Sequence, residues 1–395
     1  MTLRQKIEQE IRERGPIPFS RYMEMCLYDP ALGYYSRNAE QFGKAGDFYT
    51  SSDVHAVFGR LLARQFDEMW RALGSPERME ILEIGPGRGL FAQDVLDWSR
   101  KKFPAFFDAV HYSLAESSPA LRGRLQATLE RHFVAGKVSL CSDGKVMSGE
   151  GTTLVVPKAG TVERALAPEV HVIVFANEFF DALPVEVLSP QGELRISEKD
   201  GRLLESWQPA SAEALEFLDR YGVHPEAGER IEASLIAQRY MSQIAATIKR
   251  GFIIAIDYGY TRQEQLAGRH RGTIAAYRQH SMSANPYEAP GEQDITAHVN
   301  FTALAAAAEG QGMQVQPLLT QSQFLLGIGE HNQFADAFEE CRLPQEHAKV
   351  ALQLKHLVTP EGMGESFQVL VASKGISAEL VSKLSGLTFG KTTRP

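Results

Sequence analysis

Short apolar runs alternate with helical patterns along the middle of the chain. The runs typical of buried strands lie at residues 80–84, 110–115, 138–140, 170–175 and 252–256. Helical spacing of apolar residues is found at residues 55–73, 90–101 and 119–132. Strands that alternate with helices predict a parallel sheet covered on both faces, and therefore a doubly wound α/β fold.

Three regions depart from this rhythm. Residues 3–14 and 20–27 predict short helices, residues 185–250 contain strand-like runs followed by a helix near 230–249, and residues 261–300 show little periodicity. A long irregular segment within a compact chain is usually functional or disordered. We predict that residues 1–75 form an N-terminal helical region that contributes to an active-site lid. The core is expected to comprise residues 76–185, 251–260 and 301–375. Residues 186–250 are predicted to form an insertion, residues 261–300 a substrate-side insertion, and residues 376–395 a tail.

Composition narrows the class of protein. The 395 residues are 44% hydrophobic and carry a net charge of −8, which indicates a globular chain rather than a disordered one and argues against general binding to nucleic acid or anionic membranes. Three scattered cysteines predict neither a disulfide framework nor a metal site. There is no apolar run of about 18 residues and no signal-like start, so the sequence predicts a cytoplasmic protein without a membrane span.

The strongest local motif is a glycine-rich turn between a predicted strand and a predicted helix. It contains Gly85, Pro86, Gly87 and Gly89. Glycines permit a tight turn and close approach of a ligand, and the following helix offers unpaired N–H groups. Glu83 would repel a pyrophosphate but can order the turn or bind an ammonium group. This favours S-adenosylmethionine over a dinucleotide, with an ordinary structural turn as the alternative.

A second acidic residue, Glu116, follows the next predicted strand, and Ser117 comes directly after it. A carboxylate at this position can accept hydrogen bonds from both ribose hydroxyls of a bound nucleotide. The alternative is an exposed carboxylate at the start of a helix. Together with the glycine turn, Glu116 predicts nucleotide binding.

A polar motif follows the strand at 170–175. Asn177, Glu178 and Asp181 lie within five positions among aromatic residues, at the edge where such folds bind ligands. The carboxylates could bind a cationic substrate or accept hydrogen bonds from a nitrogen nucleophile. The alternative is a helix start capped by Asn177.

Asp294 and His298 would share one face if their segment were helical. Two such residues are too few for a metal site, so a structural histidine bonded to Asp294 is favoured. The tyrosines of residues 33–35 are interpreted as packing residues.

Longer motifs extend over nearly the whole chain. They are Gly15-Pro16-Ile17, Tyr28-Asp29-Pro30, Gly46-Asp47-Phe48-Tyr49-Thr50, Glu83 to Gly89, Asn177 to Val185, Asp257-Tyr258-Gly259-Tyr260, Asp294 to Phe301 and Gly362-Met363-Gly364. With these motifs the chain resembles the MidA-like methyltransferases, which use S-adenosylmethionine and include a mitochondrial complex I assembly factor that dimethylates an arginine. It departs from the family at residues 51–55 and 139–143.

The resemblance implies a Rossmann-like S-adenosylmethionine-dependent methyltransferase core with an added, largely helical substrate-side region. It implies methylation of an arginine in a partner protein, with S-adenosylhomocysteine as the product. The residues assigned are Asn177, Glu178 and Asp181 as catalytic; Glu83, Gly85, Pro86, Gly87, Gly89, Glu116, Ser117 and Asn177 as cofactor-binding; and Asp47, Thr50, Tyr258, Asp294 and His298 as substrate-side. A small-molecule N- or O-methyltransferase and a cofactor-binding assembly factor without turnover remain alternatives, and the oligomeric state stays open.

Overall fold

The computed structural model describes residues 1–36, 56–141, 171–278 and 285–389. It also describes the backbone of three short strands, which are β5 (Val146–Met147), β6 (Thr153–Leu154) and β14 (Ser281–Ser283).

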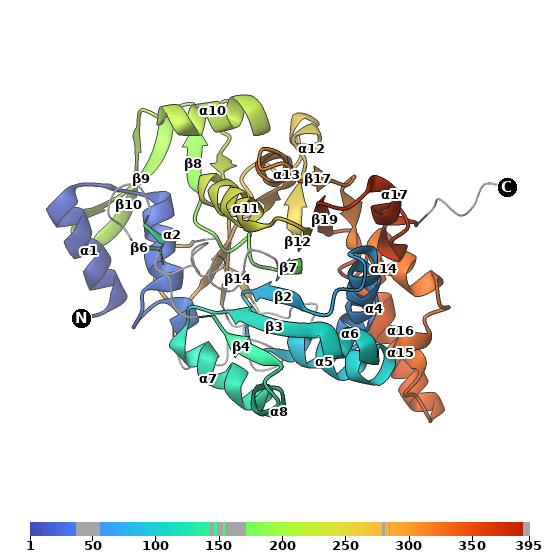
Figure 1. Ribbon diagram of the computed structural model, residues 1–395. Helices are drawn as coiled ribbons and strands as arrows, with labels where there is room; N and C mark the ends of the chain where they lie inside the picture. Colours follow the sequence, from blue (N-terminus) through green and yellow to red (C-terminus); the bar gives the residue numbers. More distant parts are fainter. Residues whose placement is uncertain are drawn as a thin grey trace.

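A nine-stranded sheet forms the centre of the molecule, with the strand order β17-β19-β12-β7-β2-β3-β4 (Figure 1). The strands are β2 (Met79–Ile84), β3 (Val110–Ala115), β4 (Val138–Leu140), β7 (His171–Asn177), β12 (Gly251–Tyr260), β17 (Gln314–Val315) and β19 (Phe367–Lys374), with β16 (Val299–Asn300) beside β12 and β18 (Leu319–Thr320) beside β19. The five strands from β4 to β12 run parallel to one another, β19 runs antiparallel to β12, and β17, which pairs antiparallel with β19, runs in the same direction as the five. The predicted doubly wound, mostly parallel sheet is therefore confirmed.

Helices cover both faces of this sheet. One face packs against α4 (Ala56–Ala72), α5 (Leu90–Lys102), α6 (Pro104–Ala109), α14 (Gln321–Glu330), α15 (Ala335–Phe338) and α16 (Pro344–Val358). The other packs against α11 (Leu235–Thr247) and α13 (Phe301–Glu309). In β7, Phe175 belongs to the first core and Val174 to the second. Because both faces are buried, β7 and β12 contain continuous apolar runs rather than an alternating pattern.

The remaining described elements lie on the core or follow it. They are α7 (Pro119–Thr128) and α8 (Glu130–Val134) between β3 and β4, and α17 (Ala378–Val381) and the 3-10 helix η2 (Ser385–Leu387) after β19.

The added region combines the expected helices with two antiparallel sheets. Its helices are α1 (Leu3–Arg14), α2 (Phe19–Tyr28), the 3-10 turn η1 (Tyr34–Ser36), α10 (Ala212–Tyr221) and α12 (Arg262–Leu266). A five-stranded sheet contains β1 (Ile17–Pro18), β8 (Glu186–Ser189), β9 (Gly192–Lys199), β10 (Arg202–Gln208) and β11 (Ile231–Ala233). A three-stranded sheet contains β13 (Ala275–Arg278), β14 and β15 (Asp294–Thr296). The second sheet lies in the segment for which the sequence showed little periodicity. Its strands are too short to give a clear alternating pattern, and they are stabilised by pairing with each other.

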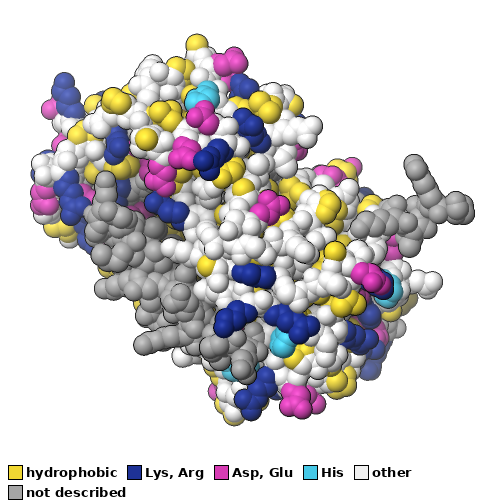
Figure 2. All heavy atoms as spheres, turned by 45° about the horizontal axis from the view of Figure 1, so that its top comes forward, with side chains coloured by type: hydrophobic (Ala, Val, Ile, Leu, Met, Phe, Trp, Pro, Cys, Tyr) yellow, Lys and Arg dark blue, Asp and Glu magenta, His cyan; other side chains and the backbone are white. Residues whose placement is uncertain are grey.

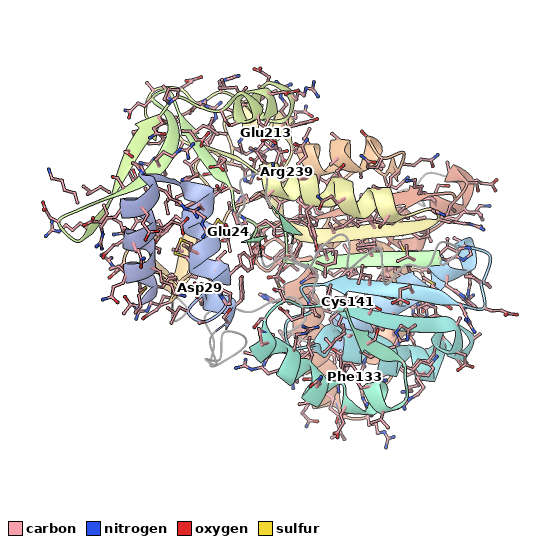
Figure 3. The ribbon with its side chains drawn as sticks, turned by 60° about the vertical axis from the view of Figure 1, so that its left-hand side comes forward. Glu24, Asp29, Phe133, Cys141, Glu213 and Arg239 are labelled. Carbon is pink, nitrogen blue, oxygen red and sulfur yellow. The ribbon has the colours of Figure 1, made fainter. Side chains whose placement is uncertain are left out.

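The added region lies beyond the carboxyl ends of the parallel strands, with α1 and α2 at one end of the molecule (Figures 1 and 3). Glu213 of α10 forms an ion pair with Arg239 of α11 at 3.6 Å, which connects this region to a helix that covers the core (Figure 3). Figure 2 shows acidic and basic side chains interspersed over the upper part of the visible face. Within the described ranges, none of the helices has the length and apolar character needed to span a bilayer.

Candidate functional site

The turn after β2 is built from glycines in left-handed backbone conformations. Gly85, Gly87 and Gly89 have φ angles of 68°, 53° and 78°, which residues with a side chain adopt only at a cost. The Gly85 N–H donates to the Ala115 carbonyl at 3.1 Å, and the Gly89 N–H donates to the Pro86 carbonyl at 2.9 Å. Gly89 is the N-cap of α5 and supplies no side-chain cap, so the first N–H groups of that helix are available to a ligand.

The turn after β2 also contacts the turn after β7. A Cβ atom at Gly85 would lie 3.0 Å from Cδ2 of Phe179. The strand order reverses between β2 and β7, because β3 and β4 lie on one side and β12 on the other. Ligands of doubly wound folds bind at such a reversal, outside the carboxyl ends of the strands.

Glu83 is a buried carboxyl group near the end of β2. Its side chain accepts a hydrogen bond from the Tyr112 hydroxyl at 2.8 Å. Burial raises the pKa of Glu83 to about 8, although the Tyr112 hydrogen bond acts in the opposite direction. A positively charged group placed beside it would favour the ionised form.

Glu116 follows β3 and is also buried. Its Oε1 accepts the Ser118 N–H at 2.8 Å, and Ser118 caps α7 by accepting the Leu121 N–H at 3.3 Å. Burial raises the pKa of Glu116 to about 7, and hydrogen bonds from the backbone of Ser117 and Ser118 oppose this rise. Glu116 therefore supports the start of α7, as one interpretation of the sequence expected, but it does so from a buried position rather than an exposed one.

The motif after β7 forms a strained turn rather than a helix start. Glu178 has a φ of 51°, a left-handed conformation that costs a residue with a side chain about 1–3 kcal/mol. Its N–H donates to the Ile256 carbonyl at 2.9 Å. The Asn177 amide nitrogen donates to Glu178 Oε1 at 3.0 Å, and the buried Asn177 Oδ1 has no hydrogen-bond partner among the residues that the structure describes.

Asp257 holds this turn in place. Its Oδ2 accepts the backbone N–H groups of Phe179, Phe180 and Asp181 at 3.1, 2.9 and 3.3 Å. Its Oδ1 accepts the Tyr258 N–H at 2.9 Å. A fully buried carboxyl group at the end of β12 thus replaces the helix cap that the alternative interpretation assigned to Asn177.

Asp181 lies in a group of acidic and phenolic side chains from four parts of the chain. Burial and the nearby carboxyl groups of Asp257 and Asp294 hold its pKa well above the ordinary value. The Tyr35 hydroxyl donates to Asp294 Oδ1 at 3.0 Å, and the Tyr28 hydroxyl donates to the Ala182 carbonyl at 2.9 Å. A cation placed beside these carboxyl groups would be favoured, because it would compensate buried negative charge.

The expected pairing of His298 with Asp294 is wrong. Asp294 begins β15, and the segment is extended, so residues four apart are separated by about 13 Å along the chain. The Nδ1 atom of His298 instead lies 3.0 Å from Nδ1 of His270, and its ring stacks on Tyr258 with a centroid distance of 6.4 Å. Burial and His270 lower the pKa of His298 to about 4.

The structure brings several of the assigned residues together, whereas others lie outside the residues that it describes. The cofactor-side residues gather at the ends of β2 and β3, and Asn177, Glu178 and Asp181 gather at the end of β7. Tyr258 follows Asp257 in β12 and lies beside this motif. Asp47 and Thr50, like the adenine-side segment at 142–169, fall outside the described side chains.

The sequence interpretation missed Asp257, Tyr28 and Tyr35. The signal for Asp257 was the one used for Glu116, an acidic residue near the carboxyl end of an apolar strand. No local pattern identified the two tyrosines, because their partners are more than 80 residues away in the chain.

The residues present fit S-adenosylmethionine. The glycine turn allows close approach, Glu83 and Glu116 suit a ligand with an ammonium group and a ribose diol, and Asn177 Oδ1 is a buried acceptor that needs a donor. Across the ranges that the structure covers, the side chains form no group of three or more residues suited to a metal ion.

Comparisons with known proteins agree with this fit. The family model described as "Putative S-adenosyl-L-methionine-dependent methyltransferase" matches residues 61–319. The chain is 30% identical over 92% of its length to the mitochondrial protein arginine methyltransferase NDUFAF7 of Danio rerio and covers 84% of that protein. It is 29% identical over 97% of its length to the Drosophila melanogaster homologue and covers 87% of that chain.

A solved structure with the same overall fold contains the methyl-transfer product. This Burkholderia thailandensis protein, bound to S-adenosyl-homocysteine, superposes with a TM-score of 0.78 at 28% identity, over 96% of this chain and 94% of that one. The sequence-based location, cytoplasmic, is contradicted, because the curated relatives are named as mitochondrial proteins. Composition and net charge reflect the needs of a globular fold, which are similar in both compartments.

Proposed function

Because the chain belongs to the family of S-adenosyl-L-methionine-dependent methyltransferases, we propose that it methylates an arginine side chain of a partner protein. One observation carries the choice of acceptor. Asp181 is buried, the nearby carboxyl groups of Asp257 and Asp294 raise its pKa, and Glu178 in the same turn raises the pKa of Asp257. The names of the relatives as protein arginine methyltransferases support the same acceptor.

The carboxyl groups match the demands of a guanidinium acceptor. A guanidinium stays protonated and delocalised, so its nitrogen is a weak nucleophile. Carboxylates that bind it through paired hydrogen bonds orient one nitrogen and stabilise the charge that develops on transfer. Asp181, whose pKa is raised in the free protein, becomes easier to ionise when a cation is bound.

The cofactor supplies a methyl group on a positively charged sulfur. In the reaction the carbon–sulfur bond breaks, a carbon–nitrogen bond forms, and the acceptor nitrogen releases one proton. We assign the orientation of the nitrogen to Glu178 and Asp181, and the uptake of the released proton to a carboxylate of this group. Asn177, through its free Oδ1, positions a donor group of either ligand.

Incubation with methyl-labelled S-adenosylmethionine and lysate from cells lacking this protein tests the proposal. We expect label on an arginine of a discrete protein, located by mass spectrometry. The matched control is Glu178→Gln, which should abolish the label. Label confined to small molecules, or to another side chain, would overturn the assignment of the acceptor.

A further inference from the structure

We propose that Tyr35 is a positioning residue that connects the cofactor side of the site to the acceptor side. Its backbone contacts the turn that carries Glu116, and its hydroxyl contacts Asp294. That the acceptor binds near Asp294 rests on the proposed function, whereas the connection through Tyr35 rests on its hydrogen bonds to Ser118 and Asp294.

On the cofactor side, the contact passes through Ser118. The Ser118 hydroxyl donates to the Tyr35 carbonyl at 2.6 Å, and the Ser118 N–H donates to Glu116 Oε1 at 2.8 Å. Ser118 is buried, so water competes little for these bonds. A ligand that fixes the Glu116 carboxylate therefore also fixes the residue that holds Tyr35.

On the acceptor side, the contact is made by the phenol. The Tyr35 hydroxyl donates to Asp294 Oδ1 at 3.0 Å, and Asp294 is the first residue of β15. The next segment connects to the β7 motif, because the Ala297 N–H donates to the Asp181 carbonyl at 2.9 Å. Tyr35 thus helps to place Asp294 and, through the Ala297 hydrogen bond, the segment that carries Asp181.

The segment that presents Tyr35 is held by hydrogen bonds, an ion pair and close packing. Asp29 follows α2 (Figure 3). Its Oδ1 accepts the N–H groups of Ala31 and Leu32 at 3.0 and 2.9 Å. Lys6 of α1 binds the same carboxylate at 2.9 Å. Gly33 packs so closely that an added Cβ would lie 2.5 Å from the Asp29 backbone nitrogen. A fixed base allows a displacement at one end of Tyr35 to be transmitted to the other.

Two sites joined by such a residue should be coupled, since ordering one lowers the cost of ordering the other. Binding of S-adenosylhomocysteine at Glu116 should therefore protect residues 285–300 although they lie on the other side of the site. A residue with only a structural role would lower stability without changing this response to the ligand.

Hydrogen–deuterium exchange of the full chain with and without S-adenosylhomocysteine tests the coupling. In the wild type we expect the ligand to slow exchange at least about threefold in residues 116–125 and in residues 285–300. In Tyr35→Phe, which keeps the ring and the backbone carbonyl, protection of 116–125 should remain and protection of 285–300 should be lost.

Tyr22→Phe is the matched control. Tyr22 is a buried tyrosine of α2 whose hydroxyl donates to the Pro286 carbonyl at 2.7 Å, so it also connects this region to residues 285–300, but its hydroxyl bonds to neither Glu116 nor Ser118. This variant should keep both responses. If Tyr35→Phe does not fold, Ser118→Ala breaks the other end of the connection and should show the same selective loss, which Ser118→Thr should restore.

Ligand-dependent protection of 285–300 that persists in Tyr35→Phe would overturn the proposal. So would a wild type that binds the ligand and protects only residues 116–125. The experiment uses no acceptor, so its outcome is independent of whether arginine is the methylated group.

Discussion

The two sides of the site are assembled in different ways. The cofactor side is made of residues that follow directly from strand ends, namely the glycine turn after β2 and Glu116 after β3. The acceptor side joins the turn after β7, the end of β12, the start of β15 and the N-terminal segment that ends in η1. Contacts within a strand-turn-helix unit position the first, and tertiary contacts across the whole chain position the second.

This difference determines how each side responds to substitution. A change on the cofactor side should act on ligand affinity, because the turn is held by its own backbone hydrogen bonds. A change on the acceptor side should act on rate or on stability, since Asp257 holds the turn after β7 and Asp294 accepts the Tyr35 hydroxyl.

The largest effect is expected for Glu178→Gln. The substitution keeps the shape but removes the negative charge that we assign to the acceptor. The rate of methyl transfer should fall at least about 100-fold, or roughly 2.7 kcal/mol, as for the loss of one preorganised electrostatic contact. Affinity for S-adenosylhomocysteine, measured by calorimetry, should stay near the wild-type value.

The control for this variant is Glu213→Gln, which removes an exposed carboxylate paired with Arg239 away from the site. It should leave rate and affinity unchanged. If Glu178→Gln loses cofactor affinity together with activity, Glu178 belongs to the cofactor side, and its assignment to the acceptor side is wrong.

Glu116→Gln should produce the next largest effect, and on affinity instead of rate. If the carboxylate accepts both ribose hydroxyls, the amide should weaken binding of S-adenosylhomocysteine by about 1.5–3 kcal/mol, the value of hydrogen bonds to a charged group. Calorimetric titration measures this loss. An unchanged dissociation constant would restrict Glu116 to its observed role beside Ser118.

Asp257→Asn should mainly reduce stability. Its two oxygens accept four backbone N–H groups, and an amide replaces one of these acceptors with a donor. Buried N–H groups left unsatisfied should cost about 1–3 kcal/mol, measured by chemical denaturation. Activity should fall as well, because the Glu178 conformation depends on this turn. A free energy of unfolding equal to that of the wild type would show that the turn after β7 does not depend on the Asp257 hydrogen bonds.

The sequence predicted the cofactor side better than the acceptor side for a physical reason. Strand periodicity and glycine spacing are local, so they identified β2, its turn and Glu116 without knowledge of the fold. Asp294 and His298 were paired on the assumption of a helix, but β13 recruits their segment into a sheet. Tyr35 finds its partners at Ser118 and Asp294, and only the folded chain brings these distant segments together.

The smallest expected effect concerns Glu83 and pH. Burial raises its pKa from 4.5 to about 8, so between these values the folded protein holds a proton that the unfolded chain releases. The free energy of unfolding should therefore decrease as pH rises through this window, by at most about 1.4 kcal/mol per pH unit for one proton.

Glu83→Gln is neutral at every pH and can keep an acceptor for the Tyr112 hydroxyl. Between pH 6 and 7, denaturation curves should show a loss of stability that is smaller in this variant than in the wild type by about 1.3 kcal/mol, whereas Glu213→Gln should follow the wild type. Because a bound cation favours ionised Glu83, S-adenosylmethionine should reduce the pH dependence of the wild type. Equal slopes for wild type and Glu83→Gln would mean that Glu83 is already ionised in the folded protein, and the cofactor side would then contain a permanent negative charge before the ligand arrives.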